Sequence, residues 1–273
     1  MNDRRVALTT GANSGIGLAT TLELARLGFR SVGTVRSEAK AAVVVNAARD
    51  ADVDVETVQL DVTDPDACAR TMEELKPFAV INNAGSSITG SIEDVTDAEA
   101  RAAFETMVLA PMRLARLAIP HMRSRGEGRI VNVSSIYGRT STSLTGWYQG
   151  AKHALEGLSD ALRMELSRDG IRVILVEPGG FRTGIWAEAE RDVATRAGSR
   201  YEAAYRRTLD VTRRWEPFMG DPVRCAKTIG GALTTRRPRA RYLVGYDAHA
   251  LALWNSLTPT QMKDRIIRIV MAL

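Results

Sequence analysis

Short apolar runs alternate along the chain with longer stretches in which apolar positions recur at helical spacing. The apolar runs predict about seven strands, at 6–9, 31–35, 55–60, 78–81, 130–133, 172–176 and 241–244. Between them the spacing predicts helices, including a long one from Asp97 to about Arg123 that bends, if at all, near Pro111. Strands that alternate with helices of this length indicate right-handed crossovers. We therefore predict an α/β fold of the Rossmann type, a doubly wound parallel sheet with helices on both faces.

No internal repeat, low-complexity tract or linker divides this pattern, so we expect a single catalytic domain over residues 1–273. One interruption, at about 180–220, inserts two helices before the chain returns to the sheet. A segment of this size is either a lid over the substrate or a helical pair packed on the rim. Between Asp64 and Pro65 a helix is expected to begin, since aspartate can cap the helix and proline suits its first position.

A last helix is predicted at about 259–272, with Lys263, Arg265 and Arg268 set among apolar residues in helical register. A basic amphipathic helix can lie on a membrane surface. Such a helix more often packs on its own domain or on a partner subunit, and the sequence favours that interpretation over membrane contact.

Composition narrows the class of protein. The chain is 45% hydrophobic and 25% charged, as in soluble globular proteins, and no apolar run approaches the ~18 residues that span a bilayer. Residues 1–5 lead into a strand without a signal-peptide core, which predicts a cytoplasmic protein. Cys68 and Cys225 match no metal or redox spacing, and the three histidines have no neighbours at ligand spacing, so no metal is expected.

The net charge of +5 is spread over several helices, and no basic stripe interleaved with aromatic residues appears. We therefore expect no nucleic-acid partner. A solvated basic surface can still favour a phosphorylated ligand.

A glycine-rich turn follows the first strand and opens the first helix. Gly11 can make the tight turn, Gly15 lets the backbone approach a pyrophosphate, and Gly17 lets the helix lie close to the strand. The free N–H groups of the helix N-terminus face the phosphate. The turn spans Thr10 to Gly17 and includes Asn13, Ser14 and Ile16. Although the bare pattern is weak, its place between a strand and a helix favours dinucleotide binding.

The end of the second strand selects the cofactor. NAD sites place a carboxylate there for the ribose 2′-hydroxyl, whereas NADP sites place a cation for the 2′-phosphate. This chain has Arg36 there, followed by Ser37 as a second phosphate donor, which favours NADP(H). The alternative is that Arg36 is one more surface arginine.

Other polar residues also follow buried strands, where open α/β sheets bind their ligands. Asp61 and Val62 come after the third strand, and Asp61 could accept from an adenine amino group. Asn82 and Asn83 come after the fourth strand, and apart from the other motifs they would be turn formers.

Tyr148 and Lys152 are four residues apart on a predicted helix and therefore share one face. A cation beside a phenol favours the phenolate and lowers its pKa toward the neutral range. The spacing alone is common in helices. It acquires weight from the motifs around it.

Taken together, these motifs resemble those of the short-chain dehydrogenase/reductases with a Tyr-x-x-x-Lys site. The resemblance covers nearly the whole chain and follows the family order, through Thr10–Gly17, Asp61, Asn82–Gly85, Ser134–Ser135, Tyr148–Lys152 and Pro178–Thr183. It implies a sheet of about seven strands and a homodimer or homotetramer whose interface uses the long helices before and after the serine strand. Loosely, 35–38 and 241–245 resemble the hydroxysteroid and retinol dehydrogenase branch.

The resemblance also implies roles for single residues. Ser135 would polarise a substrate carbonyl, Tyr148 would exchange a proton with its oxygen, and Lys152 would lower the phenol's pKa and bind the nicotinamide ribose. Ser134 is more often structural, because it faces the other side of the strand. The remaining cofactor contacts would come from Asn83, Ala84 and Gly85 and from the segment Pro178, Gly179 and Thr183, which resembles the one that holds the nicotinamide carboxamide.

One position departs from the family pattern. Aligning Phe104–Val108 puts Met107 where the family usually has an asparagine that completes the proton network. Methionine cannot relay a proton. Either a water bound to the backbone and Lys152 suffices, which we prefer, or turnover is weakened, or the protein binds nucleotide without catalysis.

The expected activity is that of an NADP(H)-dependent carbonyl reductase or alcohol dehydrogenase acting on a small-molecule carbonyl or secondary alcohol. The alternative is a nucleotide-binding regulatory protein with little or no turnover. Large apolar residues in the candidate lid favour a bulky apolar substrate, although such residues more often serve core packing. They are Ile185, Trp186, Tyr201, Tyr205, Trp215, Phe218 and Met219, with Trp147 beside the catalytic tyrosine.

Overall fold

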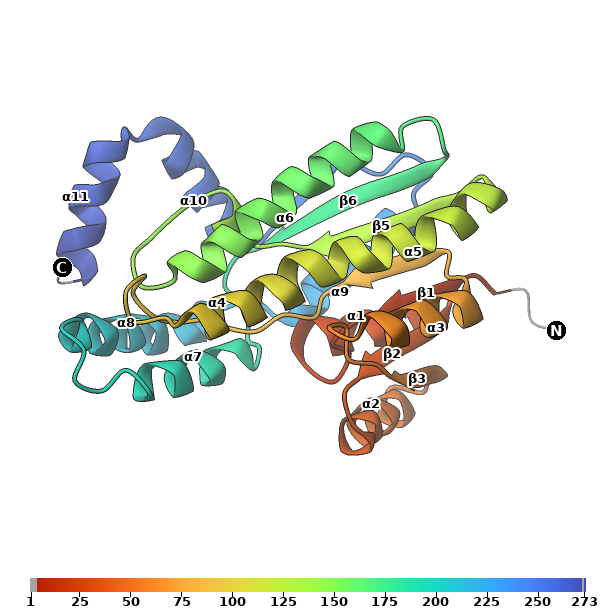
Figure 1. Ribbon diagram of the computed structural model, residues 1–273, viewed down its shortest axis with the longest axis horizontal. Coiled ribbons are helices and arrows are strands. Elements are labelled where there is room, and N and C mark those ends of the chain that lie inside the picture. The colour runs from red at the N-terminus through yellow and green to blue at the C-terminus, as the bar shows by residue number, and fades with distance from the viewer. Residues whose placement is uncertain (1–3, 272) are drawn as a thin grey trace.

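A seven-stranded parallel sheet lies between two layers of helices in the computed structural model, which describes residues 4–271 and 273 (Figure 1). The strands run in the order β3-β2-β1-β4-β5-β6-β7, and every neighbouring pair is parallel. They are β1 (Val6–Thr9), β2 (Arg30–Val35), β3 (Val55–Gln59), β4 (Ala79–Asn82), β5 (Gly128–Val133), β6 (Ile171–Pro178) and β7 (Arg241–Val244). The predicted doubly wound α/β fold is confirmed.

The helices account for most of the remaining chain. They are α1 (Gly15–Arg26), α2 (Glu38–Asp50), α3 (Pro65–Leu75), α4 (Asp97–Phe104), α5 (Ala110–Arg125), α6 (Gly146–Glu165), α7 (Ile185–Ala194), α8 (Glu202–Trp215), α9 (Pro222–Thr234), α10 (Tyr246–Leu257) and α11 (Thr260–Met271). The short turns are a π-helical turn η1 (Glu105–Leu109) and two 3-10 turns, η2 (Ile136–Gly138) and η3 (Glu216–Phe218).

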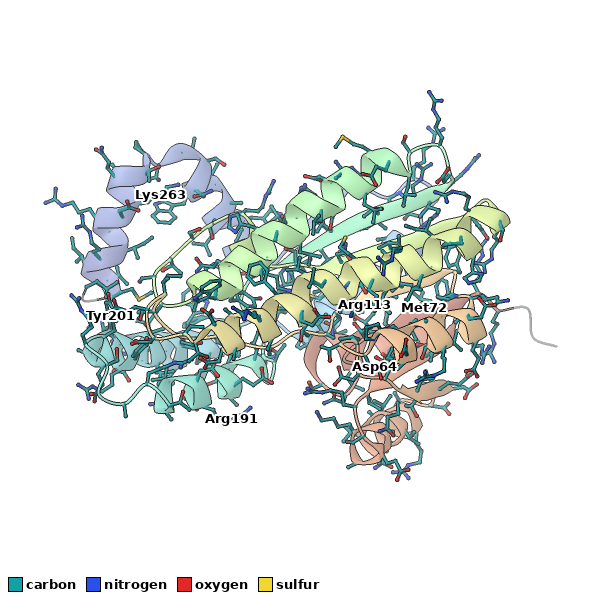
Figure 2. All side chains as sticks on the ribbon, in the orientation of Figure 1. Asp64, Met72, Arg113, Arg191, Tyr201 and Lys263 are labelled. Atoms are coloured by element: carbon teal, nitrogen blue, oxygen red, sulfur yellow. The ribbon has the colours of Figure 1, made fainter. Side chains whose placement is uncertain are left out.

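Each face of the sheet has its own apolar core. Residues of α3, α5 and α6, among them Met72 and Leu114, pack on one face, while α1 and α9 contribute Leu24 and Ile229 to the other. Strands buried on both faces cannot alternate apolar with polar residues, which explains the continuous apolar runs of the sequence. Figure 2 labels Met72 and Arg113 on neighbouring parts of α3 and α5.

Local sequence explains where α3 begins and why the predicted helix 97–123 is interrupted. The Asp64 side chain accepts hydrogen bonds from the N–H groups of Asp66 and Ala67, and Pro65 occupies the first position of α3, as predicted. The long predicted helix 97–123 is interrupted by η1 just before Pro111. Because proline has no N–H to donate to the carbonyl of Met107 four residues earlier, regular α-helical bonding cannot continue through this turn.

A chain of buried polar side chains joins the middle of the sheet to α6. The Asn82 amide donates to the Asn132 side-chain oxygen at 2.7 Å, and the Asn132 amide donates to the Ser159 hydroxyl at 2.7 Å. All three side chains are buried. These bonds fix α6, which also carries Tyr148 and Lys152, relative to β4 and β5.

The C-terminal part of the chain extends from the body of the molecule at the end far from the N-terminus (Figure 1). The predicted last helix is present as α11, and α10, which precedes it, was not predicted. Ala272, the end of that prediction, and residues 1–3 of the predicted domain lie outside the described residues. Within residues 4–271 and 273, no helix is both long and apolar enough to cross a bilayer.

Candidate active site

The glycine-rich turn lies at the carboxyl end of β1 and is shaped by close backbone contacts. A Cβ atom on Gly17 would lie 2.2 Å from the Gly11 carbonyl oxygen and 2.5 Å from the Asn83 amide nitrogen. Gly11 and Gly15 have φ values of +66° and +53°. These positions therefore require glycine, and the turn is held tightly against the start of α1.

The loop after β4 is bonded to this turn. The Thr10 hydroxyl accepts from the N–H groups of Asn83 and Ala84, both at 2.9 Å, and the Asn83 amide donates to the Thr10 carbonyl at 2.9 Å. Gly85 lies beside the Met107 side chain. The structure thus brings together two predicted motifs that lie about seventy residues apart. Asn82, in contrast, points into the core.

The N-terminus of α1 has the features of an anion-binding site. Ser14 is the N-cap residue, but its side chain makes no capping hydrogen bond. Asn13 and Ser14 keep part of their surfaces exposed, and Ile16 packs toward the core. Free N–H groups of the first helical turn can therefore receive a phosphate.

A second helix N-terminus follows β2. Ser37 is the N-cap of α2, again without a side-chain capping bond, and the preceding Arg36 is exposed. The pKa of Asp61 is lowered by hydrogen bonds from the backbone and side chain of Thr63 and, to a smaller extent, by the charge of Arg36. Arg36, Ser37 and Asp61 therefore share one edge of the sheet. Val62 lies inward in the core, and its carbonyl accepts from Arg113 at 2.9 Å.

Ser135, Tyr148 and Lys152 meet at the carboxyl edge of the sheet, at the end of β5 and on the first turns of α6. The Ser135 hydroxyl accepts from the Tyr137 N–H at 3.1 Å and is also hydrogen-bonded to the Tyr148 phenol. The Lys152 amine lies 5.7 Å from the centre of the Tyr148 ring and donates to the Val133 carbonyl at 2.9 Å. A hydroxyl, a phenol and an ammonium thus converge at the edge of the sheet that also carries the glycine-rich turn.

The pKa values of this site differ from the sequence-based expectation. Burial raises the pKa of Tyr148 to about 12, against the opposing hydrogen bond from Ser135, although the residue keeps part of its surface open to solvent. Burial also lowers the pKa of Lys152 to about 8, which the charge of Glu156 opposes. The pKa of Tyr148 is thus raised where the sequence led us to expect a lowered one, and burial is the largest cause of this shift.

The segment after β6 faces the nucleotide turn. Pro178 ends β6, and a Cβ atom on Gly15 would lie 2.9 Å from the Thr183 methyl group. The Asp247 carboxylate accepts from the Gly180 N–H at 2.5 Å, and a Cβ atom on Gly179 would lie 2.2 Å from it. The sequence placed Pro178, Gly179 and Thr183 at the site but missed Asp247, for which no motif gives a signal.

Tyr137 is a second residue that the sequence analysis missed. Burial raises the pKa of its phenol, as does the charge of Asp247, and Tyr137 in turn raises the pKa of Tyr148. The sequence offered one signal for Tyr137 as a site residue, its position two residues after Ser135.

Met107 lies where the alignment put it. The residue belongs to the π turn η1, is buried, and packs in a cluster with Ala151 and Tyr148. Its thioether fills the space beside Gly85. A π turn leaves backbone carbonyls without regular helical partners, so polar backbone groups remain at this position although the side chain is apolar.

The interruption between β6 and α9 consists of α7 and α8, as predicted, and it is bonded to the loop after β4. Side chains of α7 accept from that loop, Glu188 from the Ser87 N–H at 3.1 Å and Asp192 from the Thr89 N–H at 2.8 Å. The Tyr205 hydroxyl donates to Asp94 at 2.6 Å.

The large apolar residues of this segment fall into two groups. Tyr205 and Met219 are buried in packing, and the Trp186 indole donates to the Phe181 carbonyl at 2.7 Å. Trp215 and Phe218 are exposed, at 49% and 74%. The segment thus has its own hydrogen bonds and apolar contacts, and its role as a lid stays a prediction.

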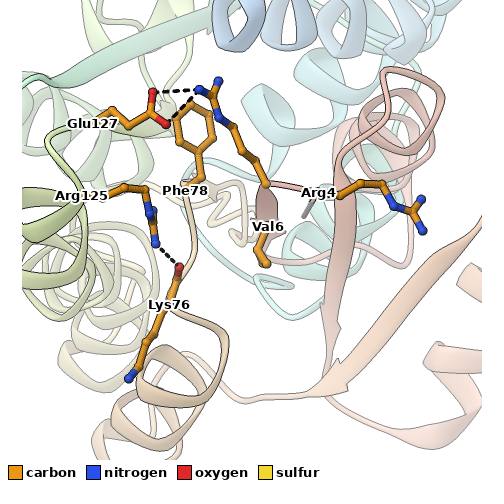
Figure 3. Close-up of a pocket in the computed structure, with 7 residues that line it drawn as sticks. Arg4, Val6, Lys76, Phe78, Arg125 and Glu127 are labelled. Carbon is orange, nitrogen blue, oxygen red and sulfur yellow. Dashed lines mark hydrogen bonds and ion pairs between the residues drawn. The ribbon is translucent and has the colours of Figure 1, made fainter. Parts of the chain in front are cut away.

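A basic pocket of about 370 Å³ lies at the opposite edge of the sheet (Figure 3). Its lining includes Arg5, which pairs with Glu127 at 2.9 Å, and Arg125, which donates to the Lys76 carbonyl at 2.8 Å. Because it contains none of the predicted site residues and lies at the amino ends of β1 and β4, we do not consider it the active site.

The doubly wound sheet and the residues at its carboxyl edge are those of the Rossmann class of α/β proteins. The family model for short chain dehydrogenases matches residues 5–194. The chain therefore belongs to the short-chain dehydrogenase/reductase family.

Two relatives cover nearly the whole chain. An uncharacterised oxidoreductase of Bacillus subtilis, YusZ, is 32% identical over 275 residues, which is 97% of this chain and 98% of the relative. Retinol dehydrogenase 16 of Mus musculus is 30% identical over 295 residues, 98% of this chain and 88% of the relative. The loose resemblance to the retinol dehydrogenase branch is thus confirmed.

Solved structures with this fold bind either nicotinamide cofactor. A variant of actinorhodin polyketide ketoreductase solved with NADPH has a TM-score of 0.78 at 26% identity, covering 92% of this chain and 98% of its own. A short chain dehydrogenase/reductase from Burkholderia phymatum in complex with NAD has a TM-score of 0.80 at 26% identity, covering 96% and 95%.

Proposed function

We propose that this oxidoreductase interconverts a carbonyl and a secondary alcohol with NADP(H), using Tyr148 as the acid and base. The observation that supports this proposal is the convergence of Ser135, Tyr148 and Lys152 at the carboxyl edge of the sheet. The same edge carries the turn Thr10–Gly17, whose backbone has no room for side chains at its glycines. In this proposal the sheet, the helices that cover it and the carboxyl edge form a single catalytic domain.

In the reductive direction, a bound NADPH supplies the hydride that forms the new C–H bond. Tyr148 donates its phenolic proton to the carbonyl oxygen, and Ser135 donates a hydrogen bond to the same oxygen. With its pKa raised to about 12, Tyr148 is a neutral phenol at pH 7 and carries the proton that reduction requires. In the oxidative direction, Tyr148 must first lose its own proton, and the phenolate then removes the alcohol's proton, so alkaline pH favours oxidation.

Lys152 binds the nicotinamide ribose in this proposal. Its amine is buried and donates to one carbonyl, that of Val133, which leaves two of its three N–H donors for ribose hydroxyls. The other proposed contacts would hold the rest of the cofactor. The pyrophosphate would be held by Gly11, Asn13, Ser14, Gly15, Ile16 and Gly17, and the adenine by Asp61 and Val62. The middle would be held by Asn83, Ala84 and Gly85, and the carboxamide by Pro178, Gly179 and Thr183.

The preference for NADP(H) over NAD(H) depends on Arg36 and Ser37. The exposed guanidinium of Arg36 and the uncapped N-terminus of α2 can together bind a 2′-phosphate. A carboxylate at this position, as in NAD sites, would repel that phosphate. We expect Arg36→Ala to weaken NADPH binding at least about tenfold, while NADH binding changes little. Arg49→Ala, on an exposed arginine near the end of α2, is the matched control. Equal losses for both cofactors would refute this preference.

The substrate in this proposal is a bulky apolar carbonyl or alcohol. Support comes from Trp147 and Phe104, whose rings meet edge to face at 6.2 Å next to Tyr148, and from a relative that is named a retinol dehydrogenase. Activity with aliphatic, aromatic and steroid ketones, each with NADPH and NADH, tests this choice.

The decisive variant is Tyr148→Phe. Purified protein should oxidise NADPH with a carbonyl panel, and Tyr148→Phe should reduce this rate at least about 100-fold with NADPH binding retained. Tyr246→Phe, at a tyrosine that is 83% exposed, serves as control. Equal rates for wild type and Tyr148→Phe would refute the catalytic assignment.

A second candidate function is a nucleotide-binding regulatory protein with little or no turnover. The observation that favours it is Met107, which cannot relay a proton through the position where the family usually has asparagine. Tyr148-dependent oxidation of NADPH would exclude this function.

We further propose a homodimer or homotetramer that forms through α5 and α6. A groove of about 560 Å³ between these helices is lined largely by apolar residues, among them Met112, Ile119, Leu158 and Leu162. Light scattering of wild type and Leu158→Glu tests this interface. The cytoplasmic location stays a prediction.

A further inference from the structure

The C-terminal helix α11 presents its apolar side to solvent. Met262, Ile266, Ile269 and Val270 are 51%, 41%, 70% and 41% exposed. Their spacing of four, three and one residues places them on one side of the helix. No residue of α11 is buried among those that the structure describes. A helix that packed on its own domain would turn this side inward.

The preceding helix α10 repeats this arrangement. Tyr246, Leu253 and Leu257 are 83%, 61% and 73% exposed and share one side of the helix, because they lie seven and four residues apart. Ala248 is the buried residue of α10.

Polar contacts, in contrast, join these helices to each other and to α8. The Lys263 amine donates to the Asn255 side chain at 2.6 Å, and Figure 2 shows Lys263 between the two helices. From α8, the Arg207 guanidinium donates to the Val270 carbonyl at 3.2 Å. The inner contacts of α10 and α11 are thus partly polar and the outer side is apolar, the reverse of an ordinary surface helix.

The charges of α11 and of the adjacent α8 are mostly positive. In α11, Lys263, Arg265 and Arg268 accompany a single acid, Asp264. The adjacent α8 carries four arginines, Arg206, Arg207, Arg213 and Arg214, against Glu202 and Asp210. A second copy of the chain would bring these cationic helices together, which is unfavourable, whereas an anionic lipid surface complements them.

We propose that α10 and α11 form a docking surface for an anionic bilayer, with their exposed apolar side chains inserted at the headgroup level. A helix of 12 residues is about 18 Å long, too short for a hydrocarbon core of about 30 Å, so α11 lies in the plane of the membrane surface. The sequence pattern favoured packing of this helix on its own domain or on a partner subunit, because the pattern does not show which side of the helix faces inward. This inference does not depend on the proposed reaction.

The test is co-sedimentation of the full chain with vesicles of phosphatidylcholine, alone or mixed with phosphatidylglycerol. We expect binding to the mixed vesicles, weaker binding at high salt, and at least about tenfold weaker binding of Ile266→Ser/Ile269→Ser. The control is Val43→Ser/Val45→Ser, at two exposed apolar residues of α2 that are 47% and 50% exposed. It should bind as the wild type does.

Several outcomes would overturn the proposal. They are no binding to mixed vesicles, equal binding of Ile266→Ser/Ile269→Ser and wild type, or binding independent of phosphatidylglycerol and salt. If light scattering shows that Ile266→Ser/Ile269→Ser dissociates an oligomer while neither kind of vesicle retains the wild type, the surface is a subunit interface and the proposal fails. Circular dichroism confirms that both double variants are folded.

Discussion

Two cations border one face of α6, the buried Lys152 and the half-buried Arg241 of β7, and their surroundings are opposite. Lys152 is 6% exposed and forms no ion pair with any described residue. Arg241 of β7 contacts three carboxylates, Glu156, Glu177 and Asp160, with Glu177 at 2.8 Å. Lys152, Glu156 and Asp160 recur every four residues, so one face of α6 borders both sites.

The difference appears in the pKa values. At Arg241, burial would lower the pKa, but hydrogen bonds to Glu177 and Glu156 reverse this and raise it. At Lys152, burial lowers the pKa to about 8, and the charge of Glu156 only partly opposes it. Removing a cation from a paired cluster leaves its carboxylates without a partner and destabilises the fold, whereas an unpaired buried cation is itself costly and is a candidate for function.

The largest expected effect is on activity at the unpaired cation. Lys152→Met should lower the rate of NADPH oxidation at least about 100-fold, because the ribose loses its ammonium donor and the Tyr148 site loses its cation. The same variant should be more stable at pH 7. The lowered pKa corresponds to about 3 kcal/mol, offset by about 1 kcal/mol for the lost hydrogen bond to Val133. Chemical denaturation measures the net gain of about 2 kcal/mol, and a loss of stability would contradict the assignment of an unpaired charge.

The next effect is on stability at the paired cation. Arg241→Met leaves three carboxylates near one another without their shared partner, and we expect it to destabilise the protein by about 3 kcal/mol. Arg163→Met is the matched control, since Arg163 contacts the same Asp160 from a more exposed position and should cost less than about 1 kcal/mol. Similar losses for the two variants would show that the cluster does not act as one unit.

The stability difference between wild type and Lys152→Met should depend on pH. Below pH 8 the amine is charged in both the folded and unfolded states, so the full cost of the buried charge is present. Between pH 8 and 10.5 the folded protein has lost the proton that the unfolded chain still holds, so wild-type stability rises with pH relative to the variant. Denaturation at pH 7 and pH 9.5 measures this. A difference that is constant between these values would contradict the lowered pKa.

The smallest expected effect is at Glu156, which borders both cations. Glu156→Gln removes the charge that supports protonated Lys152, so the pKa of Lys152 should fall further. The rate of carbonyl reduction should then begin to fall at a lower alkaline pH than in the wild type, while turnover at acidic pH changes little. Glu165→Gln, at the end of the same helix, should leave the profile unchanged.

The sequence predicted those features that depend on local residue patterns. The turn Thr10–Gly17, the cap at Asp64 and the strand ending in Ser135 follow from glycine, capping and apolar runs, and all lie where expected. It could not predict the partners of Arg241, because these come from β6 and α6, more than sixty residues away. Nor could it predict the sign of the pKa shift at Tyr148, which depends on the surrounding burial and not on the spacing to Lys152.

The buried chain from Asn82 through Asn132 to Ser159 also bears on how the protein folds. Its two hydrogen bonds join residues that are 50 and 27 positions apart. Neither can form in an isolated hairpin or helix, and unpaired amides inside the core would be costly. The part of α6 that carries Tyr148 and Lys152 therefore reaches its native alignment only when β4, β5 and α6 dock together. The arrangement of residues around Tyr148 should therefore form in the late, cooperative step of folding and not before it.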